Sequence, residues 1–216
     1  MNIVGCRALG LIVIGAVLYW LSVVVAMHLL EPEFNPVRDP MSAYVLGAYG
    51  PWMTTTYVAL SAALLGLAYG LAKTLLRTRL TSTACLLFLV AAAANFVAGL
   101  FPMDFPPPPR TLSGRLHVLG GLLAFPTMTL GTFLFSLSFR RDEYWRTVSV
   151  PSLTLSAGII GALHLGIVSL LTLGFGGYAQ RLLIALLFAW MIVVSIRLTH
   201  FPRTAEESRR SVSLSS

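Results

Sequence analysis

Six long apolar runs divide this chain of 216 residues, and they constrain its fold more than any other feature. The runs cover residues 8–30, 52–72, 83–101, 116–139, 148–173 and 182–199. A helix that spans a bilayer needs about 20 apolar residues, and its backbone polar groups must pair within the helix because lipid offers no partner. The sequence therefore predicts an all-α, polytopic membrane protein with six transmembrane helices in one bundle.

The composition supports this class and excludes several others. Hydrophobic residues make up 56% of the chain and charged residues 11%, whereas soluble domains carry about 25% charged residues. So little charge cannot cover a solvated surface, which argues against a soluble enzyme, a disordered chain or a disulfide-rich secreted module. We expect residues 1–200 to form the transmembrane domain and residues 201–216, rich in Ser, Arg and Glu, to form a disordered cytosolic tail.

The distribution of basic residues predicts the orientation in the membrane. Of 15 Lys and Arg residues, 11 lie on the side of the membrane that holds both termini. The remaining four lie on the opposite side: Arg38, Arg110, Arg115 and Arg181. The positive-inside rule then places both termini in the cytosol and the protein in the cell membrane. This arrangement explains the net charge of +7 without a nucleic-acid partner.

Polar side chains gather in the opposite, outer half. His164 lies about 13 Å inside the end of its helix, at 1.5 Å per residue, and an ionisable group at that depth is a candidate functional residue. It shares a helical face with Ala157 and Gly161. His117 shares a face with small residues and is expected to point into the bundle. His28, Glu31 and Glu33 are instead expected to be solvated at the interface.

One hypothesis from these residues is a pocket, open to the outer leaflet, that binds a lipid headgroup or a small amphiphile. Arginine binds phosphate in a bidentate manner, and aspartate and histidine would orient the ligand. The candidate ligand-binding residues are Asp39, Ser42, Arg115, Gln180 and Arg181. Membrane lipids are the expected partners, and no oligomeric state follows from the sequence.

Two alternatives come from other classes of protein. Two histidines and an aspartate form a minimal zinc-ligand set, so Asp104, His117 and His164 are candidate catalytic or metal-binding residues of an intramembrane hydrolase. Zinc is therefore a candidate cofactor, whereas an offset of about 10 Å between the two histidines argues against a shared haem. The second alternative is a structural or assembly partner, in which small-residue faces mediate helix packing.

Three motifs resemble those of a known family. They are RDPMSAYVLG at 38–47, GLFPMD at 99–104 followed by GRLH at 114–117, and GYAQR at 177–181. In order, spacing and six-helix frame they resemble the domain-of-unknown-function 998 (DUF998) family of prokaryotic membrane proteins, over residues 12–197. The Ser-x-Tyr sequence at 42–44 departs from the more usual Ser-x-Leu-Gly form. The resemblance implies the topology and the pocket residues, and no reaction. More loosely, the plan is similar to the Frag1/DRAM/Sfk1 membrane proteins.

Overall fold

The computed structural model describes residues 3–173 and 176–202, and within these residues all regular secondary structure is helical. Each of the six long helices is apolar and long enough to cross a membrane, which confirms the six predicted spans. Two short 3₁₀ helices, η1 and η2, lie in connections. The elements are α1 Ile3–Leu30, η1 Met41–Leu46, α2 Gly50–Thr74, α3 Arg79–Leu100, α4 Leu112–Phe139, η2 Trp145–Val148, α5 Ser149–Leu173 and α6 Gly177–Thr199.

Two helices, α3 and α4, begin four residues before the predicted apolar runs, and a capping threonine precedes each of them. At the start of α3, the hydroxyl of Thr78 accepts a hydrogen bond from the backbone N–H of Thr81. At the start of α4, Thr111 does the same for Gly114. Such caps satisfy N–H groups that have no partner within the helix, so a helix can begin outside the apolar run.

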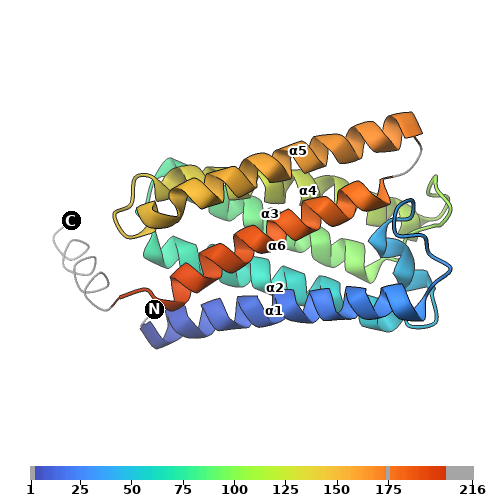
Figure 1. The fold of residues 1–216 in the computed structure, drawn as a ribbon, viewed down its shortest axis with the longest axis horizontal. Helices are drawn as coiled ribbons and strands as arrows, with labels where there is room; N and C mark the ends of the chain where they lie inside the picture. Colours follow the sequence, from blue (N-terminus) through green and yellow to red (C-terminus); the bar gives the residue numbers. More distant parts are fainter. Residues whose placement is uncertain (1–2, 174–175, 203–216) are drawn as a thin grey trace.

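Each helix packs against its neighbours in the sequence, and α6 closes the ring by packing against α1. Successive helices run in opposite directions, so the connections gather at two ends of the bundle (Figure 1). One end holds the connections α1–α2, α3–α4 and α5–α6, and we call it the loop end. The other end holds the beginning of α1 and the end of α6, and we call it the terminal end.

Aromatic side chains fill the half of the bundle nearer the terminal end. Trp145 and Trp190 are fully buried, and the ring of Phe139 stacks on both, with centroid distances of 5.1 Å to Trp145 and 6.3 Å to Trp190. The two indole N–H groups donate to the carbonyl of Thr74 and to the hydroxyl of Ser136. Buried indoles of this kind need a polar partner, and with one they form a solid core at this end.

The contact between α3 and α4 is close because α4 presents a glycine there. A Cβ atom at Gly120 would lie 2.7 Å from the carbonyl oxygen of Ala94 and 2.9 Å from the Cβ atom of Ala98. Small residues of this kind let helix backbones approach each other in lipid. This approach places His117, one turn earlier on α4, against the end of α3.

The predicted tail begins at a residue that belongs to the folded domain. Phe201 is buried, and its ring packs edge-on against Tyr144 at a centroid distance of 5.0 Å. The rest of that tail, from residue 203, lies outside the described residues. The same holds for Gly174 and Phe175 in the α5–α6 connection.

Candidate functional site

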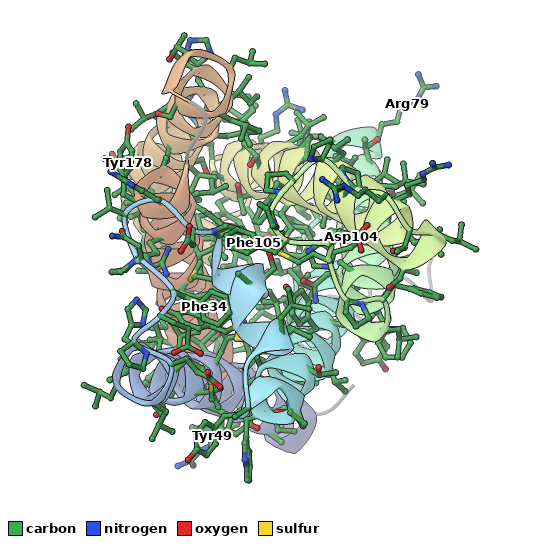
Figure 2. All side chains as sticks on the ribbon, turned by 90° about the vertical axis from the view of Figure 1, so that its right-hand side faces the viewer. Phe34, Tyr49, Arg79, Asp104, Phe105 and Tyr178 are labelled. Atoms are coloured by element: carbon green, nitrogen blue, oxygen red, sulfur yellow. The ribbon has the colours of Figure 1, made fainter. Side chains whose placement is uncertain are left out.

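The loop end is organised around η1, which folds back onto the bundle. Figure 2 looks onto this end and shows η1 near its middle, with Phe34, Phe105 and Asp104 around it. The side chain of Tyr44 on η1 is completely buried, and the ring of Phe34 packs edge-on against it at 5.5 Å. Phe34 in turn contacts Phe105 of the α3–α4 connection. The α1–α2 connection, with η1, and the α3–α4 connection therefore meet over the bundle.

Arg181, at the start of α6, joins these segments through hydrogen bonds. Its Nε donates to Nε2 of His28 on α1 at 3.2 Å, and Nη1 donates to the carbonyl of Asp39 at 2.9 Å. Further bonds reach the carbonyl of Gly177 at 3.1 Å and the hydroxyl of Tyr44 at 3.4 Å. None of these four acceptors is a carboxylate. The guanidinium is thus a clamp that ties α1, η1 and α6 together, and its donors are largely used within the protein.

The prediction that Glu31 and His28 are solvated is wrong. Glu31 is only 2% exposed, and its carboxylate accepts a hydrogen bond from the backbone N–H of Tyr49 at 2.6 Å. His28 is partly buried, and its Nδ1 donates to the carbonyl of Val24 while Nε2 accepts from Arg181. His28 lies in the last turn of the apolar run and Glu31 directly follows it, where sequence alone does not show whether a side chain is solvated or buried beneath a loop.

A cavity of about 50 Å³ lies between the helices in the loop half. Its polar lining comes from five different elements, in the order η1, α2, α3, α4 and α6: Ser42, Tyr57, Asn95, His117 and Gln180. All five side chains are uncharged when the histidine is neutral. The rest of the wall is mostly apolar and includes Trp20, Met53, Phe125 and Leu187. One water molecule needs about 10–15 Å³ of such volume, so the cavity has room for only a few atoms.

Hydrogen bonds fix the orientation of these polar groups. Nδ1 of His117 lies 2.9 Å from the carbonyl of Ala98 and 3.0 Å from that of Phe101. Because carbonyls only accept, Nδ1 carries the proton, and Nε2 of the neutral ring is the acceptor. Both amide hydrogens of Asn95 are donated, to the carbonyl of Tyr57 and to the hydroxyl of Ser61, so its carbonyl oxygen remains as an acceptor.

The polar groups nearest η1 hold that helix in place. The side-chain carbonyl of Gln180 accepts from the backbone N–H of Met41 at 2.8 Å, which leaves the amide hydrogens of Gln180 as donors. The hydroxyl of Ser42 donates to the sulfur of Met103 at 3.1 Å. The cavity therefore combines acceptors on α3 and α4 with a donor on α6.

Asp104 organises the proline-rich connection. Its carboxylate accepts from the backbone N–H groups of Arg110 and Thr111, at 2.6 and 2.7 Å, and from the hydroxyl of Thr111. The N–H of Thr111, then that of Arg110, lower the pKa of this carboxyl below its usual value. A Cβ atom at Gly114 would lie 2.4 Å from the carboxylate, so only glycine fits there. Asp104 is a loop-closing residue and does not line the cavity.

Asp39 also stabilises a turn. Its carboxylate accepts from the backbone N–H of Asn35 at 2.7 Å, and it touches Arg181 only through its carbonyl oxygen. Arg115 is exposed at the start of α4. His164 is exposed on the outer face of α5, away from the cavity. Among the described residues, no three His, Cys, Asp or Glu side chains are placed to hold a metal ion, so Asp104, His117 and His164 do not come together.

Of the eight predicted site residues, three line the cavity: Ser42, His117 and Gln180. The sequence analysis missed Tyr57 and Asn95 as lining residues, and it did not expect Tyr44 to be buried. Asn95 offered a signal, because an amide in the middle of an apolar run must find a partner inside the bundle. Tyr57 follows three threonines near the start of a helix, and nothing in this sequence pattern indicated that it would line a cavity.

The fold and this site define a multi-pass membrane protein with six long helices, five of which (α1, α2, α3, α4 and α6) line a largely apolar cavity with a few polar side chains in its wall. A family model described as "Protein of unknown function (DUF998)" matches residues 13–197. The chain therefore belongs to the DUF998 family, as its three motifs predicted. No curated protein and no solved structure matches the chain.

Proposed function

We propose that the protein binds a small amphiphile whose uncharged polar end enters the interhelical cavity. The observation that carries this proposal is the convergence of five uncharged polar side chains, from five elements, on one otherwise apolar cavity. Ligand sites in proteins typically combine apolar walls with a few placed polar groups. A cavity wall with both donors and acceptors suits a ligand with a hydroxyl or amide group, because such a group both donates and accepts hydrogen bonds.

The charges at the loop end favour an uncharged ligand over an anionic headgroup. A phosphate binds best to a guanidinium with free donors, but Arg181 spends its donors on His28, Tyr44 and two carbonyls. Arg115 is exposed and is not part of the cavity wall. The cavity itself contributes no permanent charge, and desolvating an anion there would be costly.

In this proposal the loop end faces the outer leaflet of the cell membrane, and both termini lie in the cytosol. The distribution of basic residues supports this orientation. Single cysteines at Arg77 and Pro107, in a chain without Cys6 and Cys85, test it with a membrane-impermeant maleimide on intact cells. Labelling is expected at position 107 and not at position 77, and the reverse pattern would invert the orientation.

The binding proposal is tested by titrating the protein in nanodiscs with a monoacylglycerol and with the lysophosphatidic acid of the same chain length. Trp20 lines the cavity, so a change in tryptophan fluorescence is the readout, checked by native mass spectrometry. We expect the uncharged lipid to bind more tightly. Tighter binding of the phosphate, or equal binding of both, would contradict the proposed ligand class.

A matched pair of variants separates cavity binding from lipid on the outer surface. Gly121 lines the cavity, and a Cβ atom there meets no atom within 4 Å. Gly15 has the same open surroundings but is exposed on α1. Gly121→Leu is expected to abolish binding and Gly15→Leu to leave it unchanged. If Gly121→Leu binds as the original protein does, the cavity is not the site.

A further inference from the structure

The wall of the cavity is incomplete on the side of α4 and α6. Most of the lining residues are buried, and the partly exposed ones are Tyr57, Gly121, Phe125 and Gln180. Gly121 and Phe125 lie on α4, and Gln180 lies on α6. α5 runs along the edge of the bundle (Figure 1) and packs against both of these helices, yet within the described part of the chain it contributes no lining residue. The packing of α5 therefore decides whether the cavity is closed on this side.

The contact between α4 and α5 is closed in the half nearer the terminal end. There the hydroxyls of Ser136 and Ser156 are 3.0 Å apart, and both side chains are completely buried. Residues three, four or seven positions apart share one side of a helix, so Thr129, Leu122 and Val118 continue the row of Ser136 toward the loop end. Thr129 is still buried, but Leu122 is 67% exposed and Val118 39% exposed. On α4, the side that faces α5 is thus uncovered in the loop half.

α5 shows the same change from buried to exposed along the side that faces α4. Leu163, Ile167 and Leu170 follow Ser156 at spacings of seven, four and three residues, so they continue its row. Leu163 is partly buried, whereas Ile167 is 50% exposed and Leu170 is 59% exposed. The two facing rows both become exposed toward the loop end, which shows that the helices separate there.

The separation arises partly because α5 follows α6 in the loop half. The hydroxyls of Ser169 on α5 and Tyr178 on α6 are 2.7 Å apart. A Cβ atom at Gly166 would lie 3.8 Å from the Cβ atom of Ala179, so the backbones of α5 and α6 are close at this level. These contacts hold α5 against α6 while its other side leaves α4.

α4 contributes to the separation through Pro126, which lies inside the helix. A proline within a helix removes a backbone hydrogen bond and bends the helix. Pro126 lies between the buried Thr129 and the exposed Leu122, at the level where α4 and α5 part. The two helices therefore border a lateral opening, whose sides carry Val118 and Leu122 on α4 and Ile167 and Leu170 on α5. It faces the hydrocarbon of the membrane and lies beside the partly exposed cavity wall.

We infer that the amphiphile enters the cavity sideways from the membrane through this lateral opening, and that its apolar chain then lies between α4 and α5. The inference rests on the proposed function and adds the route and the position of the chain. A cavity of about 50 Å³ holds only a few atoms, so the chain of the ligand lies outside it. At the loop end the described residues Tyr44, Phe34 and Phe105 pack over the bundle, whereas the lateral opening is lined by exposed aliphatic side chains.

The route is tested by closing the opening reversibly after the protein has folded. In a chain with Cys6 and Cys85 replaced by alanine, Leu122→Cys is modified in nanodiscs with benzyl methanethiosulfonate, and dithiothreitol removes the benzyl group again. Leu122 does not line the cavity, so the group obstructs the opening without filling the site. Leu123→Cys is the matched control, because Leu123 is also exposed and lies at nearly the same depth but about 100° around the helix.

The readout is the rate at which bound monoacylglycerol leaves the protein after mixing with excess empty liposomes, followed by tryptophan fluorescence. Modified Leu122→Cys is expected to release the lipid about tenfold more slowly or less, because exit then requires the helices to move, and dithiothreitol should restore the rate. Modified Leu123→Cys should release it at the unmodified rate. An unchanged rate in modified Leu122→Cys would overturn the lateral route and leave the binding proposal intact. A lack of monoacylglycerol binding in the unmodified chain would overturn both.

The position of the apolar chain is tested on the unaltered protein by photo-cross-linking. A monoacylglycerol with a diazirine in its acyl chain is expected to label Ile167 and Leu170 more than Leu171, although Leu171 is the most exposed of the three at 79%. Phosphatidylcholine with the same diazirine reports contact with bulk lipid and should favour Leu171. The same labelling pattern with both lipids would show that the chain does not lie in the opening.

Discussion

Replacing Arg181 by methionine tests whether this residue is a structural clamp or a ligand-binding cation. Methionine keeps the length and apolar character of the side chain but removes every donor. In the structure, the guanidinium reaches three other elements: α1 at His28, the α1–η1 connection at Asp39 and η1 at Tyr44. A clamp predicts loss of stability without any ligand, whereas a ligand-binding cation predicts loss of binding alone.

The expected loss follows from the number of these contacts. Interhelical hydrogen bonds in membrane proteins contribute about 0.6 kcal/mol on average and at most about 1.7 kcal/mol. Three such bonds correspond to about 2 kcal/mol, or roughly a 30-fold change in the unfolding equilibrium. The bond to Gly177 lies within α6 and adds little, because water at the helix start can replace it.

The assay is reversible unfolding by SDS in mixed micelles, followed by the fluorescence of the buried Trp145 and Trp190. Arg115→Met is the control, because Arg115 carries the same charge at the same end of the bundle but is exposed, and we expect a change below about 0.5 kcal/mol. Equal effects of the two variants, or an unchanged stability in Arg181→Met with loss of ligand binding, would refute the assignment of Arg181 as a clamp.

Three further predictions concern packing, the proline-rich loop and Glu31. Gly120→Ala should destabilise the fold by about 1–3 kcal/mol through overpacking against α3, and Gly15→Ala should not, as measured by the same SDS titration. In the native protein, hydrogen exchange should show protected amides at Arg110 and Thr111 down to a pH below about 4. The reason is that the lowered pKa of Asp104 keeps its carboxylate ionised, and therefore accepting hydrogen bonds, as the pH falls. The stabilisation of the loop is lost only when the pH falls below that lowered pKa. Asp104→Ala should make both amides exchange freely at every pH. Glu31→Ala should increase exchange at Tyr49, whose N–H loses its acceptor, whereas unchanged exchange would show that this bond does not hold the loop.

The transmembrane helices could be predicted from the sequence because the relevant physics is local. A run of about 20 apolar residues in lipid has no alternative to a helix, and successive helices of the chain pack beside each other. The two 3₁₀ helices were not predicted. η1 follows a proline-rich segment and is held by side chains from other elements, including Gln180 at Met41 and Arg181 at Tyr44, and such long-range contacts leave no periodic pattern.

The candidate site was only partly predictable, for a related reason. Helical periodicity correctly placed His117 on an inward face, because glycines on the same face allow α3 to approach closely. The same argument predicted an inward position for His164 as well, but the small-residue face that carries His164 points out of the bundle. A face of small residues indicates that a helix can pack closely there; it does not say whether the neighbour belongs to the same chain.

Charged and uncharged polar residues occupy different places at the loop end, and the cost of burying charge explains why. A charged group near lipid is costly unless its hydrogen bonds are satisfied, so Glu31 and Arg181 are tied to backbone and side-chain groups of the protein. An amide or neutral imidazole costs much less when one of its atoms faces a small cavity, where a water molecule or a ligand can complete its bonds. Charged side chains therefore hold the segments of the loop end together, and uncharged ones, such as Asn95 and His117, line the cavity.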